Sequence, residues 1–144
     1  MEHDFTLTEE VTAPGDPDVH YHLVDYQTQE LISKLWSRYL VEAGSKSISS
    51  GAVPAMRRVS YVLDNEGFGG QQVMRGIKVV SRSRRSVVFA GAVWHPDDGR
   101  LIHSAEMVTV FIVPGQGAVE VPEDFWAGVE KLEGKSIPIT ERKS

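Results

Sequence analysis

The chain has 144 residues, a formal net charge of −5 and no cysteine. Its 41% hydrophobic and 24% charged residues are typical of a globular protein, and the length suits a single domain over residues 1–144. Without cysteine there is no disulfide framework, thiolate metal site or cysteine nucleophile. No apolar run is long enough to span a membrane, and the acidic start "MEHDFTLTEE" is unlike a signal peptide, so we expect a soluble, cytoplasmic protein.

The chain is predicted to begin with a strand and a long helix. Residues 4–12 alternate apolar and polar side chains, which indicates a half-buried strand that ends at the turn "PGDP". A helix should start at Val19, behind the N-cap Asp18, and end before Gly44. Its buried face is marked by side chains at helical spacing: Val24, Thr28, Leu31, Leu35 and Tyr39. An acid, Asp25, lies beside this face.

Alternating side chains predict four strands in the second half of the chain. They cover residues 55–63, 71–80, 86–94 and 101–113. The connections are short, including "DNEGFGG" between the first two, and short connections favour antiparallel neighbours. Residues 122–134 indicate a short helix, followed by a loose tail to residue 144. A lone long helix must lie across such a sheet, so we expect an α+β fold.

Charge is distributed unevenly along the chain. Residues 1–30 contain eight acidic side chains and no Lys or Arg, whereas residues 57–85 contain seven basic and two acidic ones. The net charge argues against a nucleic-acid partner, and the local basic region predicts a small polyanionic ligand. Three arginines, Arg82, Arg84 and Arg85, gather at a predicted strand-to-strand turn.

The order of one strand, one long helix and four antiparallel strands resembles the hotdog fold, a curved antiparallel β-sheet wrapped around one long central α-helix. Roughly residues 4–113 take part. "SVVFAGAVWHPDDGRLIHSAEMVTVFIVP" is similar to the closing hairpin of acyl-CoA thioesterases of this fold. "HLVDYQTQ" is similar to the helix start of the phenylacetate-pathway type, in which an acidic residue follows a His-Gly-Gly motif. Asp25 stands at that acidic position, and Asp16-Pro17-Asp18 replaces the motif.

A second resemblance is to the β-hydroxyacyl carrier-protein dehydratases of the same fold. Their pattern leads from His-Phe-Pro-Gly-Asp-Pro into a helix with Glu and, four residues later, Gln. "PGDP" followed by "LVDYQTQ" is similar, and Asp25 and Gln29 keep the spacing. Thr12 stands where the dehydratases have their catalytic His.

The thioesterase resemblance implies hydrolysis of an acyl-CoA or acyl-carrier-protein thioester to a free acid and a thiol. Amides at the helix start would stabilise the oxyanion, and Gly15 would allow a close approach. Asp25 would act as base or nucleophile, and Thr28 and Gln29 would position water on the same side of the helix. No metal or resident cofactor is expected.

Coenzyme A would enter this reaction only as part of the substrate. The resemblance implies that Arg82, Arg84 and Arg85 bind its phosphates, because guanidinium groups grip phosphate oxygens well. It also implies a homodimer or homotetramer, since exposed strand edges need to be covered.

Other interpretations stay open at this level. Asp25 could be solvated or paired with an arginine, and the arginine cluster could be a solvated turn. The chain could also be a β-hydroxyacyl thioester dehydratase or hydratase, or a non-catalytic acyl-thioester binding protein. His103, within a predicted strand, is interpreted as structural, and "GFGG" (67–70) as a turn because it does not open a helix.

Overall fold

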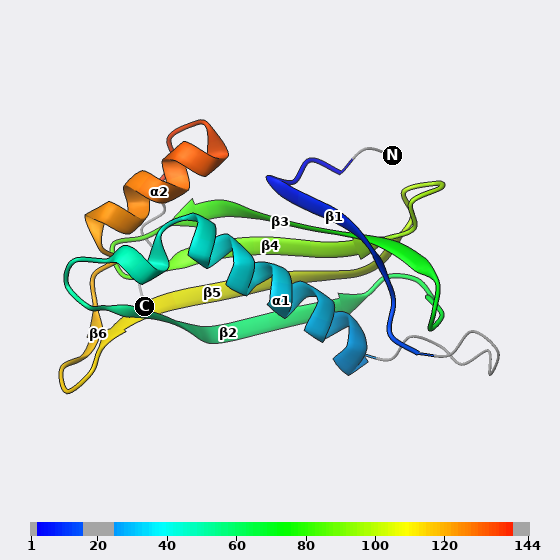
Figure 1. Cartoon of the computed structure of the whole chain (residues 1–144), viewed down its shortest axis with the longest axis horizontal. Coiled ribbons are helices and arrows are strands. Elements are labelled where there is room, and N and C mark those ends of the chain that lie inside the picture. The colour runs from blue at the N-terminus through cyan, green and yellow to red at the C-terminus, as the bar shows by residue number, and fades with distance from the viewer. Residues whose placement is uncertain (1–2, 16–24, 140–144) are drawn as a thin grey trace.

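The structure is a computed structural model that describes residues 3–15 and 25–139, without the side chains of Asp25 and Tyr26. The described residues form a six-stranded antiparallel sheet and two α-helices (Figure 1). The strands are β1 (Leu7–Thr12), β2 (Val53–Leu63), β3 (Gln72–Arg82), β4 (Val87–Trp94), β5 (Leu101–Val113) and β6 (Gly117–Val119). The helices are α1 (Asp25–Glu42) and α2 (Glu123–Glu133), with a 3-10 turn η2 (Ser45–Ser47) after α1.

The strand order is β1-β3-β4-β5-β2, with β6 paired to β5. The prediction that "DNEGFGG" joins two neighbouring strands is wrong, because β2 pairs with β5 and not with β3. Both edges of β3 are already occupied, one by β1 and the other by β4. Residues 64–71 therefore cross from the edge strand β2 to β3, and the length of this connection alone could not reveal its path.

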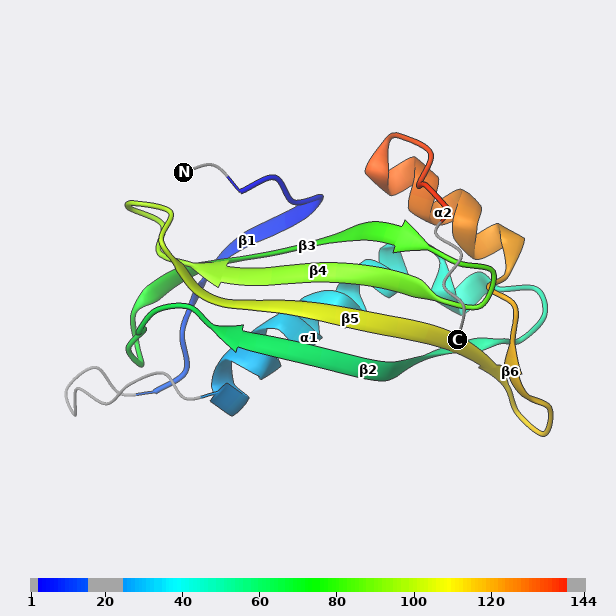
Figure 2. The same cartoon turned by 180° about the vertical axis from the view of Figure 1, so that it is seen from behind.

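Helix α1 lies across one face of the sheet, here called the inner face, and Figure 2 shows the opposite face with α1 behind it. The predicted spacing of its buried side chains is confirmed for Thr28, Leu31, Leu35 and Tyr39, all 8% exposed or less. The predicted helix start at Val19 and cap at Asp18 lie outside the described residues. The short helix expected near residues 122–134 is confirmed as α2. The described fold therefore has a second α-helix beside the long helix α1.

Two contacts set the position of α1 along the sheet. A Cβ on Gly91 of β4 would lie 2.8 Å from Cγ2 of Ile32, so the glycine leaves room for that side chain. One turn later, Nε1 of Trp36 donates a hydrogen bond to Oγ1 of Thr109 on β5, at 2.9 Å. Gly91 pairs with Ala105, so the two contacts lie at Ala105 and Thr109 along β5 and fix the direction in which α1 crosses the sheet.

One carboxylate of helix α2 joins three other parts of the fold. Glu133 accepts hydrogen bonds from Tyr39 Oη at 2.5 Å, from Thr6 Oγ1 at 2.7 Å and from the Val79 amide at 3.3 Å. These partners come from α1, from the chain just before β1, and from β3. Burial, together with the bond to Glu133, raises the pKa of the Tyr39 hydroxyl far above its usual value, so it remains a donor.

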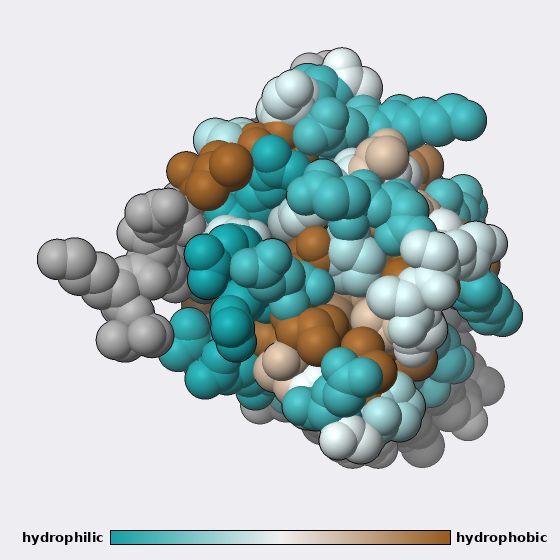
Figure 3. Space-filling view, turned by 90° about the vertical axis from the view of Figure 1, so that its left-hand side faces the viewer, coloured by the Kyte–Doolittle hydropathy of each residue, from teal (hydrophilic) through white to brown (hydrophobic). Residues whose placement is uncertain are grey.

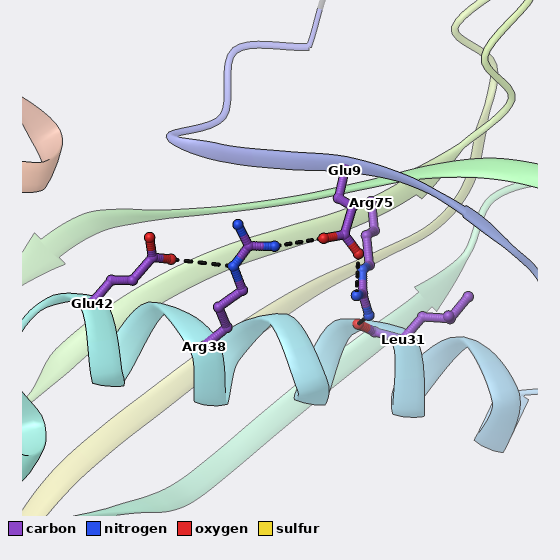
Figure 4. A network of polar contacts seen from close by, with 5 residues as sticks. All are labelled: Glu9, Leu31, Arg38, Glu42 and Arg75. Carbon is purple, nitrogen blue, oxygen red and sulfur yellow. Dashed lines mark hydrogen bonds and ion pairs between the residues drawn. The ribbon is translucent and has the colours of Figure 1, made fainter.

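Arg75 links β1, β3 and α1 (Figure 4). Its side chain, 12% exposed, donates to the carbonyl oxygen of Leu31 at 2.9 Å and to Glu9 at 2.5 Å. Glu9 also binds Arg38, which in turn contacts Glu42 one helical turn later. The hydrogen bond from Arg75 is the main reason why the pKa of Glu9 is lowered.

We predict that Arg75→Met lowers the unfolding free energy by about 2 kcal/mol, because it removes two hydrogen bonds from a largely buried cation and leaves Glu9 with Arg38 alone. A lowered carboxyl pKa stabilises the fold above its ordinary value of 4.5, and this contribution disappears as pH falls through the lowered pKa. Urea unfolding at several pH values should therefore show a difference from wild type that shrinks in acid. Lys34→Met, which breaks only the exposed pair with Glu30, is the matched control and should have little effect. Equal loss in both variants would contradict the prediction.

Candidate functional site

The candidate site lies at the start of α1. Asp25 is the first residue that the structure assigns to this helix, and its side chain is outside the description. Thr28 is buried at 1% exposure, on the helix face that carries Ile32, and Gln29 is half-buried beside it. The amides of residues 18–20, expected to stabilise an oxyanion, lie outside the described residues. The structure therefore tests the surroundings of Asp25 rather than its own contacts.

A histidine lies on the inner face under this part of the helix. Val93 of β4 pairs with Arg75 on one side and with His103 on the other, so the three form one row across the sheet. Because Arg75 reaches the carbonyl oxygen of Leu31, this row runs below the first turns of α1. His103 is 2% exposed, and the Tyr61 ring stacks on it with a centroid distance of 5.8 Å and an angle of 20°.

Gly15 is held in place by the loop that crosses from β2 to β3. A Cβ on Gly69 would lie 2.8 Å from the Gly15 Cα and 3.0 Å from the Pro14 carbonyl oxygen, so this approach requires glycine. Two backbone hydrogen bonds flank the contact, from the Gly70 amide to Ala13 at 2.9 Å and from the Ala13 amide to Gln71 at 2.8 Å. The "GFGG" segment is thus more than a connecting turn, because it also holds Ala13, Pro14 and Gly15 in place after β1.

The crossing loop is itself fixed at several points. The amides of Asp64 and Asn65 both donate to the Ile102 carbonyl oxygen, and Asn65 Nδ2 donates to Leu101 at 2.7 Å. His95, only 7% exposed, places Nε2 3.1 Å from the carbonyl oxygen of Glu66. These bonds tie the loop to the turn between β4 and β5 and to the start of β5, near His103.

The three predicted phosphate-binding arginines lie at the other end of the sheet, at the β3–β4 turn. Arg82 pairs with Val87, which pairs with Thr109, the partner of Trp36. Trp36 follows Asp25 by almost three helical turns, or ~16 Å along α1. One copy of the chain therefore does not bring these arginines next to the start of α1.

Each of these arginines has different surroundings. The Arg82 guanidinium lies 4.8 Å from the centre of the Trp126 ring and 3.5 Å from Glu130, so it packs against α2. Arg84 is exposed and pairs with Glu120 at 2.7 Å. Arg85 is exposed, and no ion pair of Arg85 occurs within the described part of the chain. Arg84 and Arg85 are therefore accessible to a ligand, whereas Arg82 stabilises the docking of α2.

A shallow pocket of about 840 Å³ opens far from α1's first residue, between η2, β6 and the start of α2. Figure 3 looks onto this end, where hydrophilic side chains surround a small hydrophobic area. Its rim carries the carboxylates of Glu120, Glu123 and Asp124, and Asp124 already accepts a hydrogen bond from the Ser49 amide. An acidic, open pocket is unsuited to an anionic thioester carrier, so we do not assign the site here.

Across residues 3–15 and 25–139, no three His, Asp or Glu side chains gather closely enough to hold a metal ion. None of the helices described combines the length and the apolar character that crossing a membrane requires.

We predict that Gly69→Ala loosens the contact that holds Gly15, since the new Cβ would meet backbone atoms that have no room to move. Amide hydrogen exchange should show faster exchange at Ala13 and Gly70, whose hydrogen bonds flank the contact. Gly115→Ala is the control, because its Cβ would meet nothing within 4 Å and the strain from its φ of +85° should stay in its own turn. Unchanged protection of both amides would show that the loop does not position Gly15.

The chain was compared with known proteins. No family model matches the sequence, and no curated protein matches it. Solved structures do match. A thioesterase from Thermus thermophilus, complexed with coenzyme A and Zn, aligns with a TM-score of 0.76 and 19% identity, over 92% of this chain and 98% of that one.

Two further structures show the same likeness. A hypothetical protein from Staphylococcus aureus in complex with CoA has a TM-score of 0.75 and 14% identity, covering 94% of this chain and 89% of its own. A 1,4-dihydroxy-2-naphthoyl-CoA thioesterase from Synechocystis has a TM-score of 0.71 and 13% identity, covering 88% and 96%. At such identities the likeness shows the fold alone, and it confirms the predicted one: the chain has the hotdog fold.

Proposed function

We propose that this protein hydrolyses an acyl-CoA or acyl-carrier-protein thioester to a free acid and a thiol. The observation that supports the proposal most is the position of Asp25, which begins the described part of a helix that crosses the inner face of a thioesterase-type sheet. Fold neighbours that hold coenzyme A add support for CoA as the carrier. The proposed reaction needs only water and the thioester, with no resident cofactor.

The proposed chemistry divides the task between the backbone and a carboxylate. Amides at the helix start and near Gly15 would stabilise the negative charge on the thioester oxygen, helped by the helix dipole. Asp25 would activate a water molecule or attack the carbonyl carbon itself. Thr28 is almost completely buried, so water reaches it poorly. Gln29 is half-buried and is therefore the better group to position water.

We predict that Asp25→Asn lowers the rate of thiol release from acyl-CoA by about 10²- to 10⁴-fold, because an amide cannot accept the proton or form the acyl intermediate. A panel of acyl-CoA and acyl-carrier-protein substrates would be assayed with a thiol reagent. Asp97→Asn, an exposed change in the β4–β5 turn, is the matched control and should behave as wild type. Equal rates for Asp25→Asn and wild type would remove Asp25 from its role.

The same panel distinguishes the alternatives. A change in enoyl absorbance without thiol release would indicate a hydratase or dehydratase. Coenzyme A binding in calorimetry without turnover of any thioester would indicate a binding protein.

We further propose that two copies pair along β2. This strand forms one edge of the sheet, and apolar side chains on both of its faces stay exposed: Val53 at 49%, Val59 at 37%, Val62 at 55% and Leu63 at 59%. An edge with free backbone groups and exposed apolar side chains favours pairing with a second strand. A two-fold axis would place the two β2 strands antiparallel and join the sheets of both copies.

Such pairing would give the arginine cluster a role in the site. In an antiparallel pair, opposite ends of the two sheets meet, so the β3–β4 turn of one copy lies at the α1 start of the other. Two strands, β5 and β2, lie between β4 of one copy and the edge where the copies pair. The distance across the strands from β4 to that edge is therefore ~10–15 Å. Arg84 and Arg85 would then bind the phosphates of coenzyme A whose thioester reacts at the other copy.

We predict that Val62→Lys produces a monomer, because it introduces charge along the joined edge. Light scattering behind size-exclusion chromatography would measure the mass, and calorimetry the coenzyme A affinity, which should fall in the monomer. Val41→Lys, at a similarly exposed valine on α1, is the control and should leave both unchanged. A monomeric wild type, or full coenzyme A affinity in a monomeric variant, would contradict this arrangement.

A further inference from the structure

We propose that His103 is a second catalytic residue of this site, a proton carrier that takes the proton of the attacking water and delivers it to the departing sulfur. The inference rests on the proposed function and deepens it, because it concerns the same reaction. It also changes the interpretation of His103, which the sequence indicated to be structural.

The position of His103 is the first support. It faces α1 from β5, in the row with Val93 and Arg75 that runs below the Leu31 carbonyl oxygen. Ala105, the next inward-facing residue of β5, pairs with Gly91, which gives room to Ile32. The step from Ala105 to His103 leads away from Thr109, the partner of Trp36, and therefore toward the start of α1.

The burial of the ring is the second support. His103 is 2% exposed, and such burial of a titratable ring has an energetic cost that a leucine or valine would avoid. Tyr61 of the edge strand stacks on it almost parallel, which fixes the ring plane. An apolar side chain could fill the same space. What distinguishes a histidine at this position is that its ring can take up and release a proton.

The reaction needs a group of this kind. During hydrolysis a water oxygen bonds to the carbonyl carbon and loses a proton, the carbon–sulfur bond breaks, and the sulfur gains a proton. An imidazole, with an ordinary pKa of ~6.5, lies between a carboxylic acid at ~3.9 and a thiol at ~8.5, so it can accept the first proton and return it as the second. One water and one thioester become one acid and one thiol, and His103 ends neutral, as it began.

The inference narrows the role of Asp25. With His103 as the proton carrier, the ionised carboxylate would hold the attacking water by accepting its second hydrogen bond. It would also stabilise the ring during the time when the ring is positively charged. Both residues are then required, but only His103 changes its protonation during the cycle.

Charged or titratable groups stand on the elements next to His103 and further along its row. Tyr61 faces it from β2, Arg75 with its partner Glu9 lies in the same row, and Asp25 belongs to the helix above. The neighbour on β4, Val93, is uncharged. Because the neutral ring is the active form, kcat should increase as pH rises through the titration of His103.

The test compares two histidines. His103→Gln should lower kcat by about 10²- to 10⁴-fold, leave KM unchanged and remove the rise of kcat with pH. His103→Gly should be restored in part by added imidazole, which a merely structural residue would not allow. His3→Gln, which changes a histidine that contacts Gly99 in the β4–β5 turn and has no part in the proposed site, should keep the wild-type rate and pH profile. A His103→Gln enzyme with wild-type kcat or an unchanged pH profile would overturn the proposal.

A second measurement needs neither a folded variant nor an active wild-type enzyme. Ring signals of His103 and His95 in the wild-type protein would be titrated by NMR, with and without a non-hydrolysable thioether analogue of acyl-CoA. A ligand-dependent shift of the His103 titration, with His95 unchanged, would support the proposal. If neither histidine responds while the analogue binds, His103 does not belong to the site. Absence of thiol release from every substrate would refute the proposed function by itself, whatever the titration shows.

Discussion

The attachment of α1 to the inner face of the sheet depends on Arg75. A guanidinium group that is mostly buried needs hydrogen bonds, and Arg75 obtains them from a helix carbonyl oxygen and from the Glu9 carboxylate. The same contacts join β1, β3 and α1, which are far apart in sequence. Since all the proposed chemistry takes place at the start of α1, the position of this helix relative to the sheet determines which side chains can meet there.

Three segments converge on that place by separate means. The turn at Gly15 is fixed by its contact with Gly69, the crossing loop is fixed by β5 and His95, and His103 is fixed by the sheet and by Tyr61. Each depends on backbone contacts or on ring stacking rather than on long flexible side chains. Such fixed surroundings suit the proposed reaction, because stabilisation of a developing oxyanion requires a preorganised site.

The arrangement also explains why one copy leaves the proposed site incomplete. The start of α1 and the β3–β4 turn lie at opposite ends of the sheet, and β2 forms one edge of that sheet. A molecule such as coenzyme A is long enough to need both a reacting end and a distant phosphate site. Pairing of two edges would satisfy the free backbone groups of β2 and bring both sites together.

The pattern of side chains along the chain was enough to predict most of the helices and strands. Alternation and helical spacing predicted the five long strands, α1 with its buried face from Thr28 to Tyr39, and α2, because these patterns depend only on which side chains avoid water. These patterns did not predict β6, because a strand of three residues is too short to show alternation. The carboxylate at Asp25 was also visible, as an acid beside an apolar face.

Which helices and strands contact one another became visible only in the folded structure. Strand pairing depends on which edges are free, so β2 joins β5 although a short loop connects it to β3. For the same reason His103 came to lie under the helix and Gly69 against Gly15, while the arginines came to lie at the far end. These relations join residues distant in the chain, and no local pattern of side chains encodes them.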